Sequence, residues 1–130
     1  MVAKGFTQVP GIDFGETYTL VTWLELIHMI LHIGTTKDWD IDHLDIKTVF
    51  LHGELDEEIY MEQLEGTKAF GKEDWVCRLN TSLYGLRQAS CQWDKKLYDC
   101  LNQEGFSHCA VEHSIFTCSD DLRTAIIAVE

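Results

Sequence analysis

One carboxylate, Asp45, lies between two strand-forming aliphatic residues, Leu44 and Ile46. Burying an unpaired charge is costly, so such a carboxylate has three explanations. It is capped by hydrogen bonds, it lies at the exposed end of its strand, or it holds a cation. A compact apolar turn, Val49-Phe50-Leu51, follows it closely. The residue types leave all three explanations open, and the cation is the one that would give Asp45 a chemical function.

Other chemistry-bearing residues give weaker signals. The run Glu54 to Glu58 contains four carboxylates around Leu55, and such a run is most often a solvated face. The five cysteines are an odd number without a close Cys-x-x-Cys pair, which favours reduced thiols over a disulfide frame or a zinc site. They are Cys77, Cys91, Cys100, Cys109 and Cys118.

Length and composition indicate one globular domain. The 130 residues are 45% hydrophobic, which is enough material for a core. With 22 acidic and 10 basic residues the formal net charge is -12, which argues against a nucleic-acid partner, because phosphate backbones are bound mainly by Lys and Arg. There is no apolar run long enough to span a membrane and no signal peptide. We therefore expect an intracellular protein, cytoplasmic or nuclear, that is not secreted and has no membrane partner.

Two helices are predicted from periodicity and end signals. The first begins at Thr22, which forms a capping box with Glu25, and ends at Gly34. In the second, Trp93, Leu97 and Leu101 recur at helical spacing before Gly105 stops it.

Strands account for much of the remaining chain. Residues 39–47 have the length and patterning of a strand, and 48–52 read as a tight helical turn closed by Gly53. Short strands are predicted at 59–62 and 75–79, a polar loop at 67–74, and a hairpin with arms 114–118 and 124–129 around Ser119-Asp120-Asp121. The fold class is therefore α+β, with an antiparallel sheet packed on two main helices.

Four segments together carry a family resemblance. They are VAKGFTQVPGIDFGETY (2–18), HLDIKTVFLHGELDEEIYMEQLEG (43–66), VCRLNTSLYGLRQASCQW (76–93) and HSIFTCSDDLRTAIIAV (113–129). In order and spacing they resemble the reverse transcriptase of copia-type retrotransposon Pol polyproteins, over essentially all of residues 1–130. The resemblance implies part of the fingers and palm of a right-hand polymerase, an RNA-directed DNA polymerase that uses a template-primer of RNA or DNA and dNTPs.

The resemblance also implies a role for Asp45. In the family, the matching aspartate is one of three palm carboxylates that hold two Mg²⁺ ions for nucleotidyl transfer. Two such ions stabilise the attacking and leaving oxygens together. Because Mg²⁺ prefers hard oxygen ligands, the main-chain carbonyl of Ile46 is a further implied ligand.

Further roles follow for residues near the nucleotide. Phe50 matches a bulky aromatic that excludes the ribose 2′-hydroxyl of the incoming nucleotide. Tyr84, Gly85 and Gln88 match a motif that lies against nucleotide and template. From the sequence, a packing role explains Phe50 about equally well. A packing role is also the alternative to nucleotide or template contact for Tyr84 and Gln88. For Gly85 a tight turn would suffice.

The resemblance is incomplete at the catalytic centre. The family's other two carboxylates belong to a Val-Asp-Asp motif just after the strand that matches 125–129, whereas the sequence given stops at Glu130. Asp120-Asp121 instead matches a hairpin turn. Thumb and RNase H portions are also missing from residues 1–130.

One carboxylate does not make a two-metal site. We therefore expect a fragment that is inactive by itself, with weak or no Mg²⁺ binding and little nucleic-acid binding. The alternative is a non-catalytic binding module of retrotransposon origin that associates with a protein partner.

Overall fold

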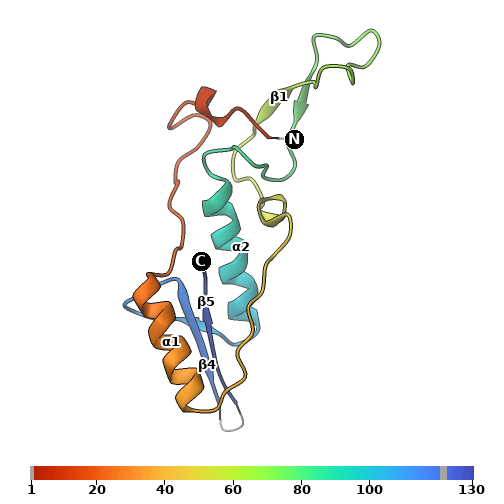
Figure 1. Cartoon of the computed structure of the whole chain (residues 1–130). Helices are drawn as coiled ribbons and strands as arrows, with labels where there is room; N and C mark the ends of the chain where they lie inside the picture. The colour runs from red at the N-terminus through yellow and green to blue at the C-terminus, as the bar shows by residue number, and fades with distance from the viewer. Residues whose placement is uncertain (1, 121–122) are drawn as a thin grey trace. The chain divides into compact units, whose positions relative to one another are not determined.

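The computed structural model describes residues 2–120 and 123–130, which form two compact units (Figure 1). The first unit consists of the chain up to Tyr18 together with Thr48–Lys96, and the second of Thr19–Lys47 together with Leu97–Glu130. Helix α2 (Ala89–Gln103) contributes residues to both. The predicted mixture of two main helices with antiparallel strands is confirmed. The strands form two separate sheets, however, and not the single sheet that we expected.

The first unit is built on two short strands and two helical turns. These elements are η1 (Gly5–Thr7), η2 (Val49–His52), β1 (Tyr60–Glu62) and β2 (Val76–Arg78). Strands β1 and β2 pair antiparallel with Met61 opposite Cys77. The buried core consists of Ile59, Leu86 and Ala89. The predicted helical turn and both short strands are thus confirmed.

Lysines of α2 hold part of the acidic run 54–58. Glu54 lies 3.0 Å from the ammonium of Lys96, and Asp56 lies 2.9 Å from that of Lys95. All four side chains remain partly exposed to solvent. Glu54, Asp56 and Glu58 are exposed, as predicted for a solvated face, whereas Glu57 is only partly exposed, and the ion pairs attach the run to the helix.

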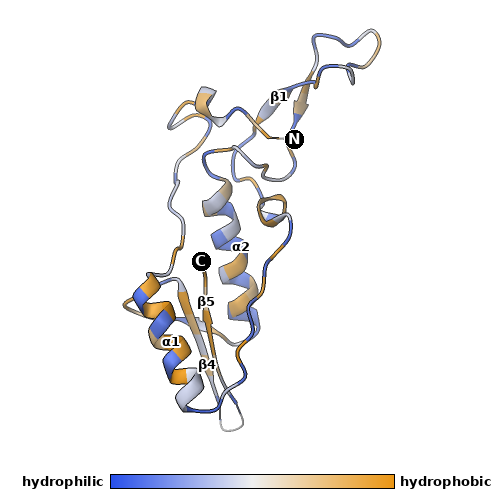
Figure 2. Cartoon of the chain, viewed as in Figure 1, coloured by the Kyte–Doolittle hydropathy of each residue, from blue (hydrophilic) through white to orange (hydrophobic). Residues whose placement is uncertain are grey.

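The second unit contains α1 (Leu24–Thr36) and a three-stranded sheet of β3 (Ser107–His108), β4 (Ile115–Ser119) and β5 (Thr124–Ala128). The sheet order is β3-β4-β5 and both pairings are antiparallel. Apolar residues are concentrated along β4 and β5 (Figure 2), and Phe116, opposite Ile127, is fully buried. The predicted hairpin is confirmed.

The hairpin turn contains Asp120, whose carboxylate accepts a 2.8 Å hydrogen bond from the backbone N–H of Arg123. The guanidinium of Arg123 also lies 3.1 Å from this carboxylate. Asp120 therefore stabilises the turn, as the sequence predicted. Asp121 lies outside the described residues.

The predicted capping box at the start of the first helix was wrong. Helix α1 begins at Leu24 with Trp23 as its N-cap, and no side chain caps it. The hydroxyl of Thr22 instead donates to the carbonyl oxygen of Val129 at 2.7 Å and lies 2.9 Å from Oγ of Ser114. A buried tertiary hydrogen bond has replaced the local cap, because Thr22 is held against the sheet.

The predicted stop at Gly34 was also wrong, because α1 continues to Thr36. Gly34 is buried, and a Cβ there would lie 3.1 Å from Cδ1 of Ile41. The glycine therefore permits close packing of the following segment on the helix. It is a packing position and not a C-cap.

Residues 39–47 do not form the strand that we predicted. Residues 39–46 have no helix or strand assignment, and a turn begins at Lys47. In the described part of the chain, they pair with no strand. A strand needs a hydrogen-bonded neighbour, and sequence alternation alone does not supply one.

All five cysteines are free thiols, in agreement with the prediction of reduced cysteines. Cys91 and Cys118 are buried and the other three are at least partly exposed. Within residues 2–120 and 123–130, no helix is long and apolar enough to cross a membrane.

Candidate functional site

The predicted site residues are distributed over both units. Asp45 and Ile46 belong to the second unit, whereas Phe50, Tyr84, Gly85 and Gln88 belong to the first.

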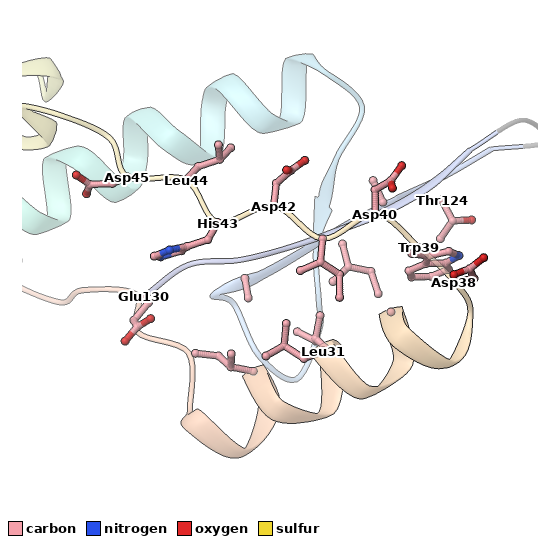
Figure 3. A pocket seen from close by; sticks show the side chains of 17 residues that line it. Leu31, Asp38, Trp39, Asp40, Asp42, His43, Leu44, Asp45, Thr124 and Glu130 are labelled. Carbon is pink, nitrogen blue, oxygen red and sulfur yellow. The ribbon is translucent and has the colours of Figure 1, made fainter.

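Asp45 lines a cavity of about 810 Å³ within the second unit (Figure 3). Helix α1, the segment 38–45 and strand β5 form its walls. The helix supplies apolar side chains, among them Ile27, Ile30 and Leu31. Five carboxylates also line the cavity, namely Asp38, Asp40, Asp42, Asp45 and Glu130.

These carboxylates do not converge on a common point. Figure 3 shows Asp40 and Asp42 pointing away from α1, Glu130 following β5, and Asp45 directed away from the other labelled carboxylates. Among the described residues, no group of three His, Cys, Asp or Glu side chains is placed to hold a metal ion. Mg²⁺ requires several oxygen ligands in near-octahedral geometry, so the residues present do not fit this ion.

Ile46 follows Asp45 in the same extended segment, and its side chain is about half exposed. The cavity residues include Asp45 but not Ile46. Within its described residues, the second unit therefore presents Asp45 at an accessible position without assembling further ligands around it.

In the first unit, Phe50 meets Tyr84. The ring of Phe50 lies on turn η2, half-buried against the core residues Ile59, Leu86 and Ala89. Its centroid is 4.9 Å from that of Tyr84, and the ring planes make an angle of 64°. This edge-to-face arrangement is a favourable one for aromatic pairs. The structure thus brings together two residues that the sequence assigned to one site.

Tyr84 is partly exposed, so one part of its ring is open to solvent while another part touches Phe50. Gly85 follows it with φ at 94°, in the region that favours glycine. A Cβ on Gly85 would also overlap the carbonyl oxygen of Ala3. The glycine therefore permits both the tight turn and the close approach of the N-terminal segment.

Gln88 lies in a different environment from Tyr84, because it is only 1% exposed. Its Oε1 accepts a 3.0 Å hydrogen bond from Nε2 of Gln8, and its own Nε2 donates to the carbonyl oxygen of Asp13 at 3.0 Å. Our sequence reasoning did not single out Gln8. The signal that could have suggested it was the need of a buried amide for a polar partner.

The first unit also contains the buried thiol of Cys91. Burial raises the pKa of the Cys91 thiol, so the thiol stays protonated near neutral pH. Burial and the neighbouring Cys91 likewise raise the pKa of Tyr18. Neither side chain is therefore activated as a nucleophile. The partly exposed ring of Tyr84 remains as the candidate for ligand contact in the first unit.

The comparisons with known proteins point to one family. A family model described as "Reverse transcriptase (RNA-dependent DNA polymerase)" matches residues 1–130. The Retrovirus-related Pol polyprotein from transposon TNT 1-94 of Nicotiana tabacum is 51% identical over 96 residues, which is 74% of this chain and 7% of that protein. The Retrovirus-related Pol polyproteins from transposons RE2 and RE1 of Arabidopsis thaliana are 37% and 35% identical, each over 89% of this chain and 8% of their own length. No solved structure matches the chain.

Proposed function

Because the chain belongs to the reverse transcriptase (RNA-dependent DNA polymerase) family and corresponds to a segment of retrotransposon Pol polyproteins, we propose that it forms part of the fingers and palm of an RNA-directed DNA polymerase. The segment spans only 7 to 8% of these relatives. In this proposal, residues 1–130 order side chains that face the nucleotide and template. The complete polymerase binds the template-primer and dNTPs.

The contact between Phe50 and Tyr84 carries the proposal. Phe50 is held on one side by the core and on the other by the ring of Tyr84, so its position is fixed. A fixed aromatic ring can exclude a ribose 2′-hydroxyl by steric overlap, whereas a mobile ring would move aside. We assign this role to Phe50, assign contact with the nucleotide to Tyr84, and assign the turn that presents Tyr84 to Gly85.

Asp45 is proposed as one of the metal-binding carboxylates of the complete polymerase, with the carbonyl of Ile46 as a further ligand. Reverse transcriptases generally use Mg²⁺. The described residues do not assemble a site for this ion, so we propose that the chain alone is inactive and binds Mg²⁺ weakly or not at all. Its net charge of -12 also favours little nucleic-acid binding.

Nucleotide contact at the first unit can be tested by NMR. The ring signals of Phe50 and Tyr84 are followed during titration with dTTP. The titration is repeated with the ribonucleotide analogue of dTTP, which carries a 2′-hydroxyl. We expect dTTP to shift both ring signals and the analogue to shift them less. Tyr84→Ala should abolish the response, while Tyr98→Ala, which removes a tyrosine of similar exposure in the second unit, should preserve it. Shifts that are equal for both nucleotides would contradict the role of Phe50.

Inactivity of the chain by itself is tested by primer extension. The substrate is poly(rA) with an oligo(dT) primer, in Mg²⁺ or Mn²⁺. We expect no incorporation of dTMP above background. Incorporation that disappears in Asp45→Asn would show that the chain assembles a working site, and the proposal of inactivity would then be wrong.

The alternative, a non-catalytic binding module, is favoured by exposed apolar side chains. Trp23 is 70% exposed and Leu44 is 83% exposed, both in the second unit. This function predicts that the purified chain associates with an intact copia-type polymerase in analytical ultracentrifugation. The association should weaken in Trp23→Ala or Leu44→Ala. A chain that sediments independently at all concentrations would exclude this partner.

A further inference from the structure

The buried amide of Gln88 is hydrogen-bonded within the protein at both its oxygen and its nitrogen. Its side chain is 1% exposed, and its oxygen and nitrogen are bonded to Gln8 and Asp13 respectively. A group that contacts a nucleotide or a template base needs a free donor or acceptor at the surface. In this arrangement Gln88 presents neither at the surface, because its side chain is buried, although its family motif suggested a place beside nucleotide and template.

Gln8 occupies the other side of the same contact. Its Oε1 accepts a 2.8 Å hydrogen bond from the backbone N–H of Arg87, while its Nε2 donates to Oε1 of Gln88. One side chain of the N-terminal segment therefore holds two consecutive residues of the loop that leads into α2. The side chain of Arg87 strengthens the contact by donating to the carbonyl oxygen of Gly5 at 3.3 Å.

Backbone contacts fix the same loop at its other end. The N–H of Ala3 donates to the carbonyl oxygen of Tyr84 at 2.7 Å. A Cβ on Gly5 would overlap the carbonyl of Gly85, and a Cβ on Gly85 would overlap that of Ala3. Figure 1 shows the start of the chain beside this loop. The N-terminal segment thus contacts the loop both before and after its glycine.

The glycine makes such anchoring necessary. Gly85 gives the loop its tight turn, but a glycine also permits many other backbone conformations. Without external contacts, the ring of Tyr84 could take several positions relative to Phe50. Two anchors, Ala3 on one side of Gly85 and Gln8 on the other, hold the turn by hydrogen bonds.

We propose that Gln8 is a positioning residue of the nucleotide site: through Arg87 and Gln88, it holds the loop that places Tyr84 against Phe50. Gln88 is a second positioning residue, and it does not contact the template. The link to the nucleotide rests on the function proposed above, whereas the positioning of the two rings can be measured without any nucleotide.

The first experiment measures the ring contact in the whole chain by NMR with labelled aromatic side chains. An edge-to-face pair produces ring-current shifts in both partners. Gln8→Ala should remove these shifts at Phe50 and Tyr84 while the amide signals of β1 and β2 stay in place. Gln8→Glu keeps the acceptor for the Arg87 N–H and should retain most of the ring-current shift.

The control variant is Thr7→Ala. Thr7 is the exposed neighbour of Gln8, and its hydroxyl makes a local hydrogen bond to the carbonyl oxygen of Lys4. Ring signals that stay unchanged in Gln8→Ala, or that change equally in Thr7→Ala, would overturn the proposal. So would a uniform loss of signals across the first unit in both Gln8→Ala and Gln8→Glu, because that result indicates general destabilisation without a positioning effect.

The second experiment adds dTTP. Loss of one or two net hydrogen bonds should weaken dTTP binding about tenfold in Gln8→Ala, with Gln8→Glu in between. Full affinity in Gln8→Ala would overturn the proposal at the nucleotide site. If the unmodified chain binds no dTTP, the nucleotide contact proposed for the first unit fails, and the ring-current measurement still decides whether Gln8 positions Tyr84.

Discussion

The carboxylate of Asp56 lies 2.9 Å from the ammonium of Lys95 on helix α2 and accepts a 3.0 Å hydrogen bond from the amide of Gln92. These contacts attach the segment after turn η2 to the helix. Gly53, which closes that turn, packs so closely on the helix that a Cβ would lie 3.0 Å from Cβ of Gln92. The position of the turn that carries Phe50 therefore depends on this part of the first unit.

Stability at acidic pH should depend on Asp56. Hydrogen bonds from Gln92 and Lys95 lower the pKa of its carboxyl below the ordinary value of 3.8. The contribution is therefore present above pH 3.8 and is lost as the pH falls through the lower, folded-state pKa. Because both charged side chains are partly exposed to solvent, we expect less than about 1 kcal/mol. Denaturant unfolding between pH 2 and 6 should show a smaller pH dependence in Asp56→Asn than in the unmodified chain.

The ion pair of Asp56 should also help to fix the turn that carries Phe50, and Asp120→Asn is the control. Asp120 pairs with Arg123 in the hairpin turn of the second unit, whereas Asp56 belongs to the first unit. Ring signals of Phe50 should move in Asp56→Asn and remain in place in Asp120→Asn. An unchanged Phe50 signal in Asp56→Asn would show that the ion pair does not help to fix the turn.

Replacement of Gly85 by alanine should destabilise the first unit. The backbone there has φ at 94°, and the added methyl group would overlap the carbonyl oxygen of Ala3. We expect a loss of about 2–4 kcal/mol in the free energy of unfolding, from backbone strain and overlap together. The control is Gly66→Ala, which has φ at 81° but nothing within 4 Å of the new Cβ. The two variants should differ by the cost of the overlap, and equal losses would contradict the close approach.

The aromatic pair should show energetic coupling. Phe50→Leu and Tyr84→Leu each remove one ring of the edge-to-face contact. A double-mutant cycle on the free energy of unfolding should give a coupling of about 0.5–1.5 kcal/mol. The parallel cycle of Phe50→Leu with Tyr60→Leu, an exposed tyrosine on β1, should give a coupling near zero. Equal couplings in the two cycles would mean that the ring contact adds nothing specific.

Thr22→Val should destabilise the second unit. The valine keeps the volume of the threonine but loses the hydroxyl that donates to Val129. Since Thr22 is 4% exposed, we expect a cost of about 1–2 kcal/mol. Thr36→Val is the matched control, because the Thr36 hydroxyl is exposed and bonds locally to the carbonyl oxygen of His32 one turn earlier. Stability is measured by thermal unfolding. Equal losses in the two variants would contradict a stabilising role for the Thr22 hydroxyl.

The sequence by itself determined the features that depend on local pattern. Helix α2, the hairpin of β4 and β5, and turn η2 all lie where periodicity and turn residues predicted them. The hydrogen bonds that define each element join residues near in sequence, which is why one sequence is enough to find them. The motif order also indicated the family, which the comparisons confirmed.

Only the tertiary structure decided how individual polar residues are used. Thr22 had the right type and spacing for a helix cap, but a distant carbonyl at Val129 takes its hydroxyl. Residues 39–46 had the pattern of a strand, but a strand requires a partner that local sequence does not specify. Gln88 belonged to a nucleotide-facing motif, yet its burial against Gln8 depends on segments far apart in the chain. Hydrogen-bond partners are chosen by three-dimensional proximity, and residue type and local spacing leave that choice open.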